Sequence, residues 1–341
     1  MPDDFTNALI ERLRASRRVR IVGAGTKPAL SRVPDGAEEL NLSGYRGMVE
    51  YEPSEFTFTA RAGTRLEEIM SELARYGQYL PFDPPLAQDG GTLGGTVAAG
   101  LNGPGRLRFG GMRDFILGVR FMTGDGRLIR GGGKVVKNAA GFDFPKLLVG
   151  SCGRLGVLLE ITFKVFPAPQ HTLTAEMHTA SLETALQLAG KLTRIPFDLE
   201  ALEILSDGTL VIRLAGDTGT LEARLARLNL EHRLTFCQSS PDCWARWSRE
   251  KWVKVPLTPA RISSLDAALN RLGVNRRYGV AGNVAWIEQA TPEVDSVLAA
   301  LELAGLALAG PRARLGAWPL RSAEDLVSRV LDPDERLSAR Y

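Results

Sequence analysis

Apolar side chains recur at two spacings along the first half of the chain. A helical repeat of apolar positions opens the sequence, and alternation of apolar with more mixed positions marks a strand that ends at Pro167. The pattern predicts helices at 3–16 and from 64 to near 77, strands at 19–22, 56–60 and 155–165, and a hairpin joining 115–123 to 127–130. The second helix is expected to begin at Thr64-Arg65-Leu66-Glu67, which has the capping-box pattern.

The second half repeats one order of elements twice. From about residue 171 to 237, and again from about 252 to 309, the pattern reads strand, helix, strand, strand, helix, strand. The expected helices cover 182–192, 220–228, 261–272 and 292–303. Each repeat is predicted to be a split β-α-β (ferredoxin-like) unit that buries one sheet face under two helices. An α/β cap with an antiparallel sheet is therefore expected over 168–315, with a helix and a polar tail over 316–341.

Composition and charge narrow the class of protein. The 341 residues suffice for two domains, and 42 basic against 39 acidic residues, without a basic block, make nucleic acid a poor partner. Residues 1–16 contain acids and no uninterrupted apolar run, unlike a secretory signal. No apolar run is long enough to span a bilayer, and three scattered cysteines suit a reducing compartment. The expected location is the cytoplasm, including docking at the inner membrane through a complex.

Glycine is concentrated in three segments of the first half, around 23–25, 90–105 and 150–156. Glycine loses more entropy than other residues on folding, so a cluster indicates positive φ or a close approach of backbone to a ligand. Three such segments favour a long, thin ligand held between loops, and a diphosphate fits because successive N–H groups bind anions. Taken alone, residues 23–27 would be explained equally well by a tight turn after a strand.

Four segments in register resemble a known family. They are 91–100, 110–118, 137–143 and 150–157. Their order and spacing are similar to those of the vanillyl-alcohol-oxidase / p-cresol-methylhydroxylase (PCMH-type) superfamily of FAD-binding proteins. Asp83-Pro84-Pro85 and residues 101–104 resemble the branch of smaller flavin subunits of glycolate-oxidising complexes. The resemblance covers about 18–167 and implies an α+β fold, with a two-subdomain FAD-binding domain over 1–167 followed by the cap.

The resemblance also implies non-covalent FAD and a set of residues around it. Those residues are Gly23, Ala24, Gly25, Thr26, Lys27, Pro84, Thr92, Gly94, Gly95, Ala98, Arg113, Asp114, Gly150, Ser151, Gly156, Val157 and Ile161. Arg113 and Asp114 are also explained by a buried ion pair that fixes the glycine loop. Lys137 and Asn138 would either approach the flavin N1–C2=O edge, where positive charge stabilises reduced flavin, or lie in a solvated loop. Arg113 and Asn138 are weak catalytic candidates.

Histidine is scarce. Superfamily members that oxidise 2-hydroxy acids resemble one another in carrying histidines that, with an acid, bind a metal or remove a proton. This chain has His171, His178 and His232, and the first two face opposite ways on a strand because they are seven residues apart. We therefore expect no metal site and place all three on the surface or in the cap. Gly100 stands where catalytic relatives tend to have a polar side chain.

Cysteine chemistry is also limited. No histidine precedes residue 171, which argues against a histidyl link to FAD and leaves Cys152 as the reactive candidate within the flavin loops. The favoured interpretation of Cys152 is a small residue tolerated in a tight turn. Cys237 and Cys243 lack the spacing of a metal or iron–sulfur site, so electron-transfer clusters would come from a partner.

A segment rich in tryptophan and arginine lies in the cap. Trp244, Trp247 and Trp252 alternate with basic residues such as Arg246 and Arg249, a composition typical of interface anchors and equally consistent with a helix whose tryptophans enter the cap core.

The resemblance implies an FAD-binding subunit of a complex that oxidises glycolate or a similar 2-hydroxy acid to the 2-oxo acid. A larger FAD-containing catalytic subunit and an iron–sulfur subunit would complete the complex. Two alternatives are a self-sufficient FAD-dependent oxidoreductase of a small alcohol or 2-hydroxy acid, and a non-catalytic scaffold subunit that has lost FAD.

Overall fold

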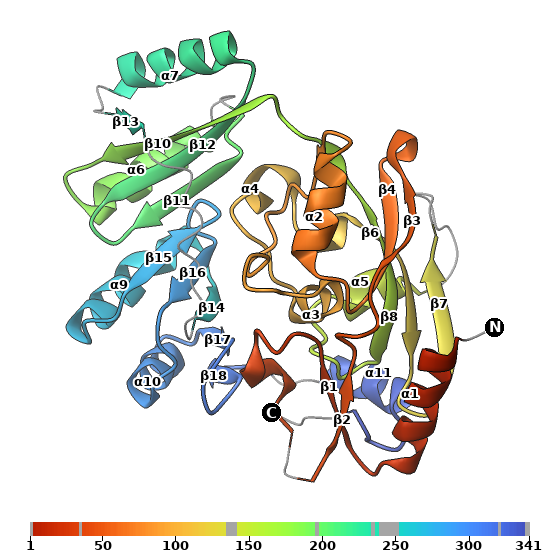
Figure 1. The fold of residues 1–341 in the computed structure, drawn as a ribbon. Coiled ribbons are helices and arrows are strands. Elements are labelled where there is room, and N and C mark those ends of the chain that lie inside the picture. The colour runs from red at the N-terminus through yellow and green to blue at the C-terminus, as the bar shows by residue number, and fades with distance from the viewer. Residues whose placement is uncertain are drawn as a thin grey trace. The chain divides into compact units, whose positions relative to one another are not determined.

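The computed structural model describes seven stretches of the chain (Figure 1), which are 3–33, 36–133, 142–194, 198–232, 236–238, 252–319 and 322–337. Within them, the side chains of 229–238 and 322–325 are not described. The chain divides into two compact units. The first contains Met1–Asn102, Gly111–Pro167 and Pro319–Tyr341, and the second contains Gly103–Gly110 and Ala168–Trp318. Residues 103–110 thus belong to the second unit although the chain on both sides of them belongs to the first. The tail from Pro319 belongs to the first unit although it follows the second in sequence.

The first unit contains two main sheets. In the smaller one, β1 (Val19–Val22) pairs in parallel with β2 (Glu38–Asn41). The larger sheet is antiparallel, and its strands in spatial order are β3 (Met48–Glu52), β4 (Thr57–Arg61), β8 (Val157–Lys164), β6 (Ile116–Met122) and β7 (Leu128–Gly132). A two-stranded ribbon pairs β5 (Gln78–Tyr79) with β9 (Phe166–Pro167). The predicted strands and hairpin of this half are confirmed.

Helices and aromatic side chains complete the first unit. Its α-helices are α1 (Asp4–Ala15), α2 (Leu66–Ala74), α3 (Leu93–Ala99), α5 (Phe144–Leu148) and α11 (Ser322–Leu331). Phe82 is fully buried between the rings of Phe115 and Phe163, with centroids 5.5 and 5.9 Å away. On β8, Ile161 and Phe163 are buried while Glu160, Thr162 and Lys164 are partly exposed, as the predicted alternation requires.

The predicted capping box is wrong. Helix α2 begins one residue later than the motif implies, with Arg65 at its N-cap and no side-chain hydrogen bond there. The hydroxyl of Thr64 donates instead to the carbonyl of Arg61 at 2.7 Å and accepts from the N–H of Gly47 at 2.9 Å. Thr64 is buried, and its hydroxyl joins Gly47, just before β3, to Arg61 at the end of β4 rather than capping the helix.

The second unit confirms the predicted duplication. The first repeat consists of β10 (His171–His178), α6 (Leu182–Leu192), β11 (Ala201–Leu205), β12 (Thr209–Gly216), α7 (Thr218–His232) and β13 (Phe236–Gln238). The second consists of β14 (Val253–Pro256), α9 (Ile262–Arg271), β15 (Arg276–Gly279), β16 (Val284–Ile287), α10 (Pro292–Ala300) and β17 (Ala304–Ala307), after which β18 (Arg314–Gly316) adds an edge strand. The short α4 (Arg106–Phe109) also belongs to this unit.

The two repeats share one antiparallel sheet, which runs from green to blue in Figure 1. Its nine strands follow the order β13-β10-β12-β11-β15-β16-β14-β17-β18. Strands β11 and β15 join the halves, with Ile204 opposite Tyr278 and Leu205 opposite Arg277. Buried side chains of the four long helices pack with alternate strand residues in one continuous apolar cluster. Among the described residues, no helix combines the length and the hydropathy needed to cross a bilayer.

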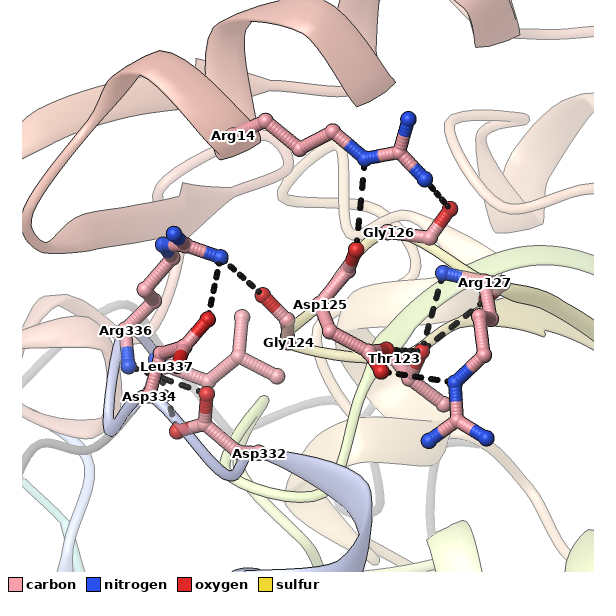
Figure 2. Close-up of polar contacts among 10 residues, drawn as sticks. All are labelled: Arg14, Thr123, Gly124, Asp125, Gly126, Arg127, Asp332, Asp334, Arg336 and Leu337. Carbon is pink, nitrogen blue, oxygen red and sulfur yellow. Dashed lines mark hydrogen bonds and ion pairs between the residues drawn. The ribbon is translucent and has the colours of Figure 1, made fainter.

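The hairpin between β6 and β7 is held from two sides by elements near the two ends of the chain (Figure 2). From α1, the guanidinium of Arg14 donates to the carbonyls of Asp125 and Gly126 at 3.3 and 3.4 Å. From the C-terminal segment, the carbonyl of Leu331 accepts the N–H of Gly124 at 2.7 Å. The turn is therefore part of the packing of this unit rather than a free loop.

Asp332 organises the C-terminal side of this contact. Its carboxylate accepts the backbone N–H groups of Arg336 and Leu337, each at 2.9 Å, and the Arg336 guanidinium donates to the carbonyl of Gly124 at 3.3 Å (Figure 2). Burial raises the pKa of Asp332, while the two N–H donors act in the opposite direction. A Cβ at position 124 would lie 1.9 Å from Oδ1 of Asp332, so only glycine permits this approach.

We expect Gly124→Ala to lower the free energy of unfolding by about 1–3 kcal/mol, because the added methyl displaces the Asp332 carboxylate from its N–H donors. Urea unfolding followed by circular dichroism measures the change. Gly44→Ala is the matched control, since its added Cβ meets only an ordinary contact 3.9 Å away. Equal stability of the two variants would show that the hairpin contact is not tightly packed.

Candidate functional site

Three separated segments of the first unit line one cleft of roughly 720 Å³, including its open mouth. They are residues 21–27 at the end of β1 and after it, Thr92 with one side of α3, and the loop before β8. The structure therefore brings together the three glycine-rich segments singled out in the sequence. Of the predicted cofactor residues, those that line this cleft are Gly23, Ala24, Gly25, Thr26, Lys27, Thr92, Gly94, Gly95, Ala98 and Gly156.

The first loop packs closely against the second. Gly25 has φ of +69°, a conformation that glycine adopts without steric cost. A Cβ at Gly23 would lie 2.5 Å from Oγ1 of Thr92, so a side chain there would push the two loops apart. The hydroxyl of Thr92 accepts the N–H of Gly95 at 3.2 Å and caps α3. Thr92 therefore shapes the cleft through its cap as well as lining it.

The third loop is hydrogen-bonded to α3. The N–H of Gly150 donates to the carbonyl of Val97 at 3.0 Å, and the N–H of Cys152 donates to that of Ala98 at 2.8 Å. Cys152 has φ of +51° and lines the cleft with Gly153. These bonds satisfy carbonyls at the end of α3 and fix the loop on its surface.

Lys27 brings a buried cation to the cleft. Its side chain is 8% exposed, and Nζ donates to the hydroxyl of Thr26 at 2.9 Å. Burial lowers the pKa of Lys27 to about 8, and the negative charge of Cys152, when ionised, acts in the opposite direction. A buried ammonium gains from an anionic partner, because isolation from water otherwise penalises its charge.

The cleft fits the chemistry of a dinucleotide. Closely approaching backbone and the Lys27 ammonium suit a diphosphate, and Leu42, Ala62 and Leu158 give another part of the wall an apolar character that suits an aromatic ring. The sequence interpretation missed these three apolar residues. Ala62 directly follows β4, so the end of the strand predicted at 56–60 was a signal that could have identified it, whereas Leu42 follows β2, a strand that was not predicted.

Several predicted cofactor residues lie outside the lining of this cleft. Val157 and Ile161 are fully buried in β8, and Pro84 is buried in a turn next to Asp83, whose φ is +45°. Gly150 and Ser151 directly precede Cys152. The Ser151 hydroxyl is buried and has no hydrogen-bond partner among the described residues, so a bound group could supply one. The roles of these residues remain predictions.

The buried ion pair considered for Arg113 and Asp114 is not present. Both side chains are exposed, on a 3₁₀ turn (Met112–Asp114). Asp114 accepts the N–H of Gly111 at 2.8 Å and so stabilises the start of that turn. A carboxylate that caps a turn at the surface needs no buried arginine. Neither residue lines the cleft found here, so their proposed contact with FAD stays a prediction.

Other candidates are distributed as follows. Lys137, Asn138, Cys243 and the Trp244–Arg249 part of the aromatic segment lie outside the described residues. The side chains of Cys237 and His232 are also not described. Trp252 is described, and the Arg277 guanidinium lies 5.4 Å from its ring centroid.

The two described histidines are surface residues, as predicted. His171 and His178 lie at the two ends of β10 and both are exposed. Nδ1 of His178 is 3.0 Å from the hydroxyl of Thr209. Within the described residues, no three His, Cys, Asp or Glu side chains are grouped as metal ligands.

Comparison with known proteins supports the sequence motifs. A family model described as FAD binding domain matches residues 3–132. The glycolate oxidase subunit GlcE of Escherichia coli (strain K12) is 40% identical over 224 residues, which are 64% of this chain and 63% of that protein. A D-lactate dehydrogenase of Archaeoglobus fulgidus is 32% identical over 144 residues, which are 42% of this chain and 32% of that protein.

A solved structure extends the likeness to the whole fold. Alkyldihydroxyacetonephosphate synthase superimposes with a TM-score of 0.68 at 15% identity, covering 99% of this chain and 74% of that chain. At this identity the likeness shows the fold alone, and the predicted α+β class is confirmed. The sequence matches span less than two thirds of each relative named above. Residues 3–132 match a family model described as FAD binding domain, so the resemblance and the cofactor inferred from the sequence motifs are both confirmed.

Proposed function

We propose that this chain is the FAD-binding subunit of a complex that oxidises glycolate or a similar 2-hydroxy acid to the 2-oxo acid. The observation that carries the proposal is the cleft, which is lined by three glycine-rich segments and by the buried Lys27. The identity to a protein named as a glycolate oxidase subunit supports the substrate class. Bound FAD supplies the two-electron acceptor of such an oxidation.

In the proposed complex, FAD is held without a covalent bond. Residues 23–27 and 92–98 contribute backbone and Lys27 contributes charge, so the chain binds and orients the cofactor through non-covalent contacts. No histidine precedes residue 171, which supports this mode over a histidyl link. The complex places the chain on the cytoplasmic side, either soluble or docked at the inner membrane.

The proposal assigns the oxidation of the hydroxy acid to a partner. A general base contributes about 10²–10⁴-fold to such a rate, and histidine is the usual choice near neutral pH. His171 and His178 of this chain lie at the surface of the second unit, and the first unit carries none in its sequence. A larger FAD-containing subunit would therefore remove the protons, and an iron–sulfur subunit would receive the electrons.

A second function follows from the D-lactate dehydrogenase match. A relative of that name supports a self-sufficient dehydrogenase that oxidises a small 2-hydroxy acid. The two proposals differ in whether the isolated chain turns over, because only the second needs a complete active site on one chain.

The test compares the isolated chain with the chain coexpressed with its partner subunits. The purified chain should be yellow and should release its flavin on acid denaturation. Its glycolate-dependent reduction of an artificial dye should be at least about 100-fold slower than that of the complex, because the base is missing.

Three results would contradict the main proposal. Equal rates for the isolated chain and the complex would establish the self-sufficient dehydrogenase. Flavin retained after denaturation would show a covalent link. A chain that stays colourless after incubation with FAD would show a scaffold without cofactor.

A further inference from the structure

The segment 331–337, which starts at the last residue of α11, bonds to two elements that support walls of the FAD cleft. We propose that this segment is a clasp whose closure and FAD binding stabilise each other. Release of the clasp weakens the binding of FAD, and bound FAD keeps the clasp closed. The inference rests on the proposed function for the location of FAD.

The first contact of the clasp is with β1, which leads directly into residues 23–27 of the cleft. The N–H of Val19 donates to the carbonyl of Arg336 at 2.9 Å. The neighbouring carbonyl of Arg18 accepts the N–H of Glu38, at the start of β2. Consecutive strand residues direct their backbone groups to opposite sides, so Val19 bonds on the side away from β2. The clasp therefore supports the edge of β1 that β2 does not cover.

The second contact is with the hairpin between β6 and β7. The N–H of Gly124 donates to the carbonyl of Leu331 at 2.7 Å, and the Arg336 guanidinium donates to the carbonyl of Gly124 at 3.3 Å (Figure 2). Two residues earlier, Met122 ends β6, and its carbonyl oxygen would lie 3.0 Å from a Cβ built on Gly156. Gly156 lines the cleft. The hairpin held by the clasp thus supports the third glycine-rich segment.

Asp332 gives the clasp its shape. Its carboxylate accepts the N–H groups of Arg336 and Leu337, each at 2.9 Å, and its carbonyl accepts the N–H of Glu335 at 3.1 Å. The carbonyl that Val19 uses therefore belongs to a residue whose own N–H is fixed by Asp332. Asp332 is not among the residues that line the cleft, so it is a positioning residue that acts through Arg336 on β1 and on the hairpin.

Few side chains hold the clasp in place. Three of the described side chains in 326–337 are buried, and they are Leu331, Asp332 and Leu337. On the preceding turns of α11, Leu326 and Val330 are 65% and 68% exposed. A segment with few buried apolar contacts opens at a lower free energy than the core of its unit. The clasp can therefore open while both sheets of the first unit stay folded.

Opening the clasp removes support from two of the three cleft walls at once. FAD bound between these walls would be held less firmly in the open state than in the closed state. If the open state binds FAD more weakly by some factor, bound FAD must suppress opening by the same factor, because coupling between two equilibria is reciprocal. Couplings of this kind are typically about 5–150-fold, and we expect about tenfold here.

The first measurement is the Kd for FAD of the full chain carrying Asp332→Ala, by fluorescence titration. The Kd should rise about tenfold, because Arg336 and Leu337 lose the acceptor that positions them. Asp332→Asn retains one acceptor oxygen and should give an intermediate Kd. Circular dichroism establishes that each variant is folded, and a loss of global stability alone leaves the Kd of a fully folded chain unchanged.

Asp334→Ala is the matched control. Asp334 lies in the same segment, is exposed, and pairs with the Arg336 guanidinium at 2.8 Å. Its removal leaves the backbone bonds to β1 and to the hairpin in place. The Kd of this variant should stay within about twofold of the wild-type value, because an exposed ion pair contributes little.

The second measurement uses the wild-type chain, so it does not depend on the folding of any variant. Hydrogen exchange followed by mass spectrometry compares the peptide that covers 331–337 with and without FAD at about 100 Kd. Exchange of this peptide should slow by about the same factor by which Asp332→Ala raises the Kd. The peptide of α9 in the second unit is the reference, and FAD should slow its exchange less.

The outcomes separate this inference from the proposed function. An unchanged Kd in folded Asp332→Ala, equal effects of Asp332→Ala and Asp334→Ala, or exchange of 331–337 that FAD slows no more than that of α9 would overturn the clasp and leave the proposed function standing. If Asp332→Ala does not fold, the exchange measurement alone decides. A wild-type chain that does not bind FAD would overturn both.

Discussion

Gly95→Val should abolish FAD binding while the first unit stays folded. Gly95 lies on α3 and lines the cleft, and a Cβ built on it points to within 4.0 Å of the Lys27 Nζ. The branched side chain of valine would occupy the space between α3 and the first loop. Its tightest contact inside the protein is the Thr92 hydroxyl at 3.0 Å, a group that can shift by a few tenths of an ångström.

Gly94 illustrates why the choice of residue decides what the experiment reports. A Cβ at Gly94 would lie 2.7 Å from the Cβ of Ala62 and 3.0 Å from the Ala62 carbonyl oxygen. Valine there would push α3 away from the end of β4 and destabilise the unit. Gly95→Val tests the cleft, whereas the same change at Gly94 would mainly test the fold.

The measurement for Gly95→Val is FAD occupancy by absorption after reconstitution, together with circular dichroism. We expect the Kd to rise at least about 100-fold, equivalent to about 2.8 kcal/mol. Gly190→Val is the matched control, because Gly190 is an exposed helical glycine of the second unit with open space around it. Full occupancy in Gly95→Val would show that the cofactor does not pass between α3 and the first loop.

The cap shows what periodicity predicts and what it leaves open. Both β-α-β-β-α-β repeats were predictable because their strands bury alternate residues and their helices bury residues three or four positions apart, both of which are local patterns. The joining of the repeats into one sheet was not, since it depends on the pairing of β11 with β15. Exposed strand edges pair through backbone groups, and side-chain patterns carry little information about that choice.

Individual polar residues were harder to predict than elements. Threonine and aspartate side chains can cap helices and turns. A local motif around Thr64 or Asp114 does not show which backbone N–H group the side chain bonds. Thr64 bonds to the backbone of Gly47, just before β3, and of Arg61 in β4, and Asp114 caps its own turn at the surface. The glycine loops were more predictable, because the restriction that they place on side chains is visible in the sequence itself.

The apolar wall of the cleft depends on tertiary structure. Leu42 and Ala62 directly follow β2 and β4, and Leu158 lies near the start of β8, and ordinary apolar residues near strand ends look alike in a sequence. The position of residues 103–110 was equally hard to predict, because this segment joins the second unit through contacts with residues far along the chain. One of these is the hydrogen bond from the Arg108 guanidinium to the carbonyl of Asp198 at 2.8 Å.

The affinity for FAD should decrease as the pH rises through about 8, and Lys27 should be the cause. Burial lowers the pKa of Lys27 to about 8 in the chain without cofactor. The diphosphate of FAD would raise that pKa by pairing with the ammonium, so binding above pH 8 takes up a proton. The Kd should be nearly constant below pH 8 and about tenfold higher at pH 9 than at pH 7.

Lys27→Met isolates the contribution of the Lys27 charge to FAD affinity and to its pH dependence. The variant should bind FAD about 10–100-fold more weakly at pH 7, because a hydrogen bond to a charged group contributes about 1.5–3 kcal/mol. Its Kd should then vary little between pH 7 and 9. Lys146→Met is the matched control, since Lys146 is exposed and pairs with Asp143 at the surface. Fluorescence titration of FAD at constant ionic strength measures both effects.

The Lys27 charge, which is expected to strengthen FAD binding, should lower the stability of the cofactor-free chain. The folded pKa of Lys27 lies below the ordinary value of 10.5, so the unfolded chain binds more protons between pH 8 and 10.5 and stability rises with pH in that window. Lys27→Met removes the penalty and should stabilise the empty chain by about 1–3 kcal/mol at pH 7. Urea unfolding without FAD measures this gain. A variant that loses both FAD affinity and stability would show that the Lys27 side chain stabilises the fold. In that case its buried charge would not be a source of instability in the empty chain.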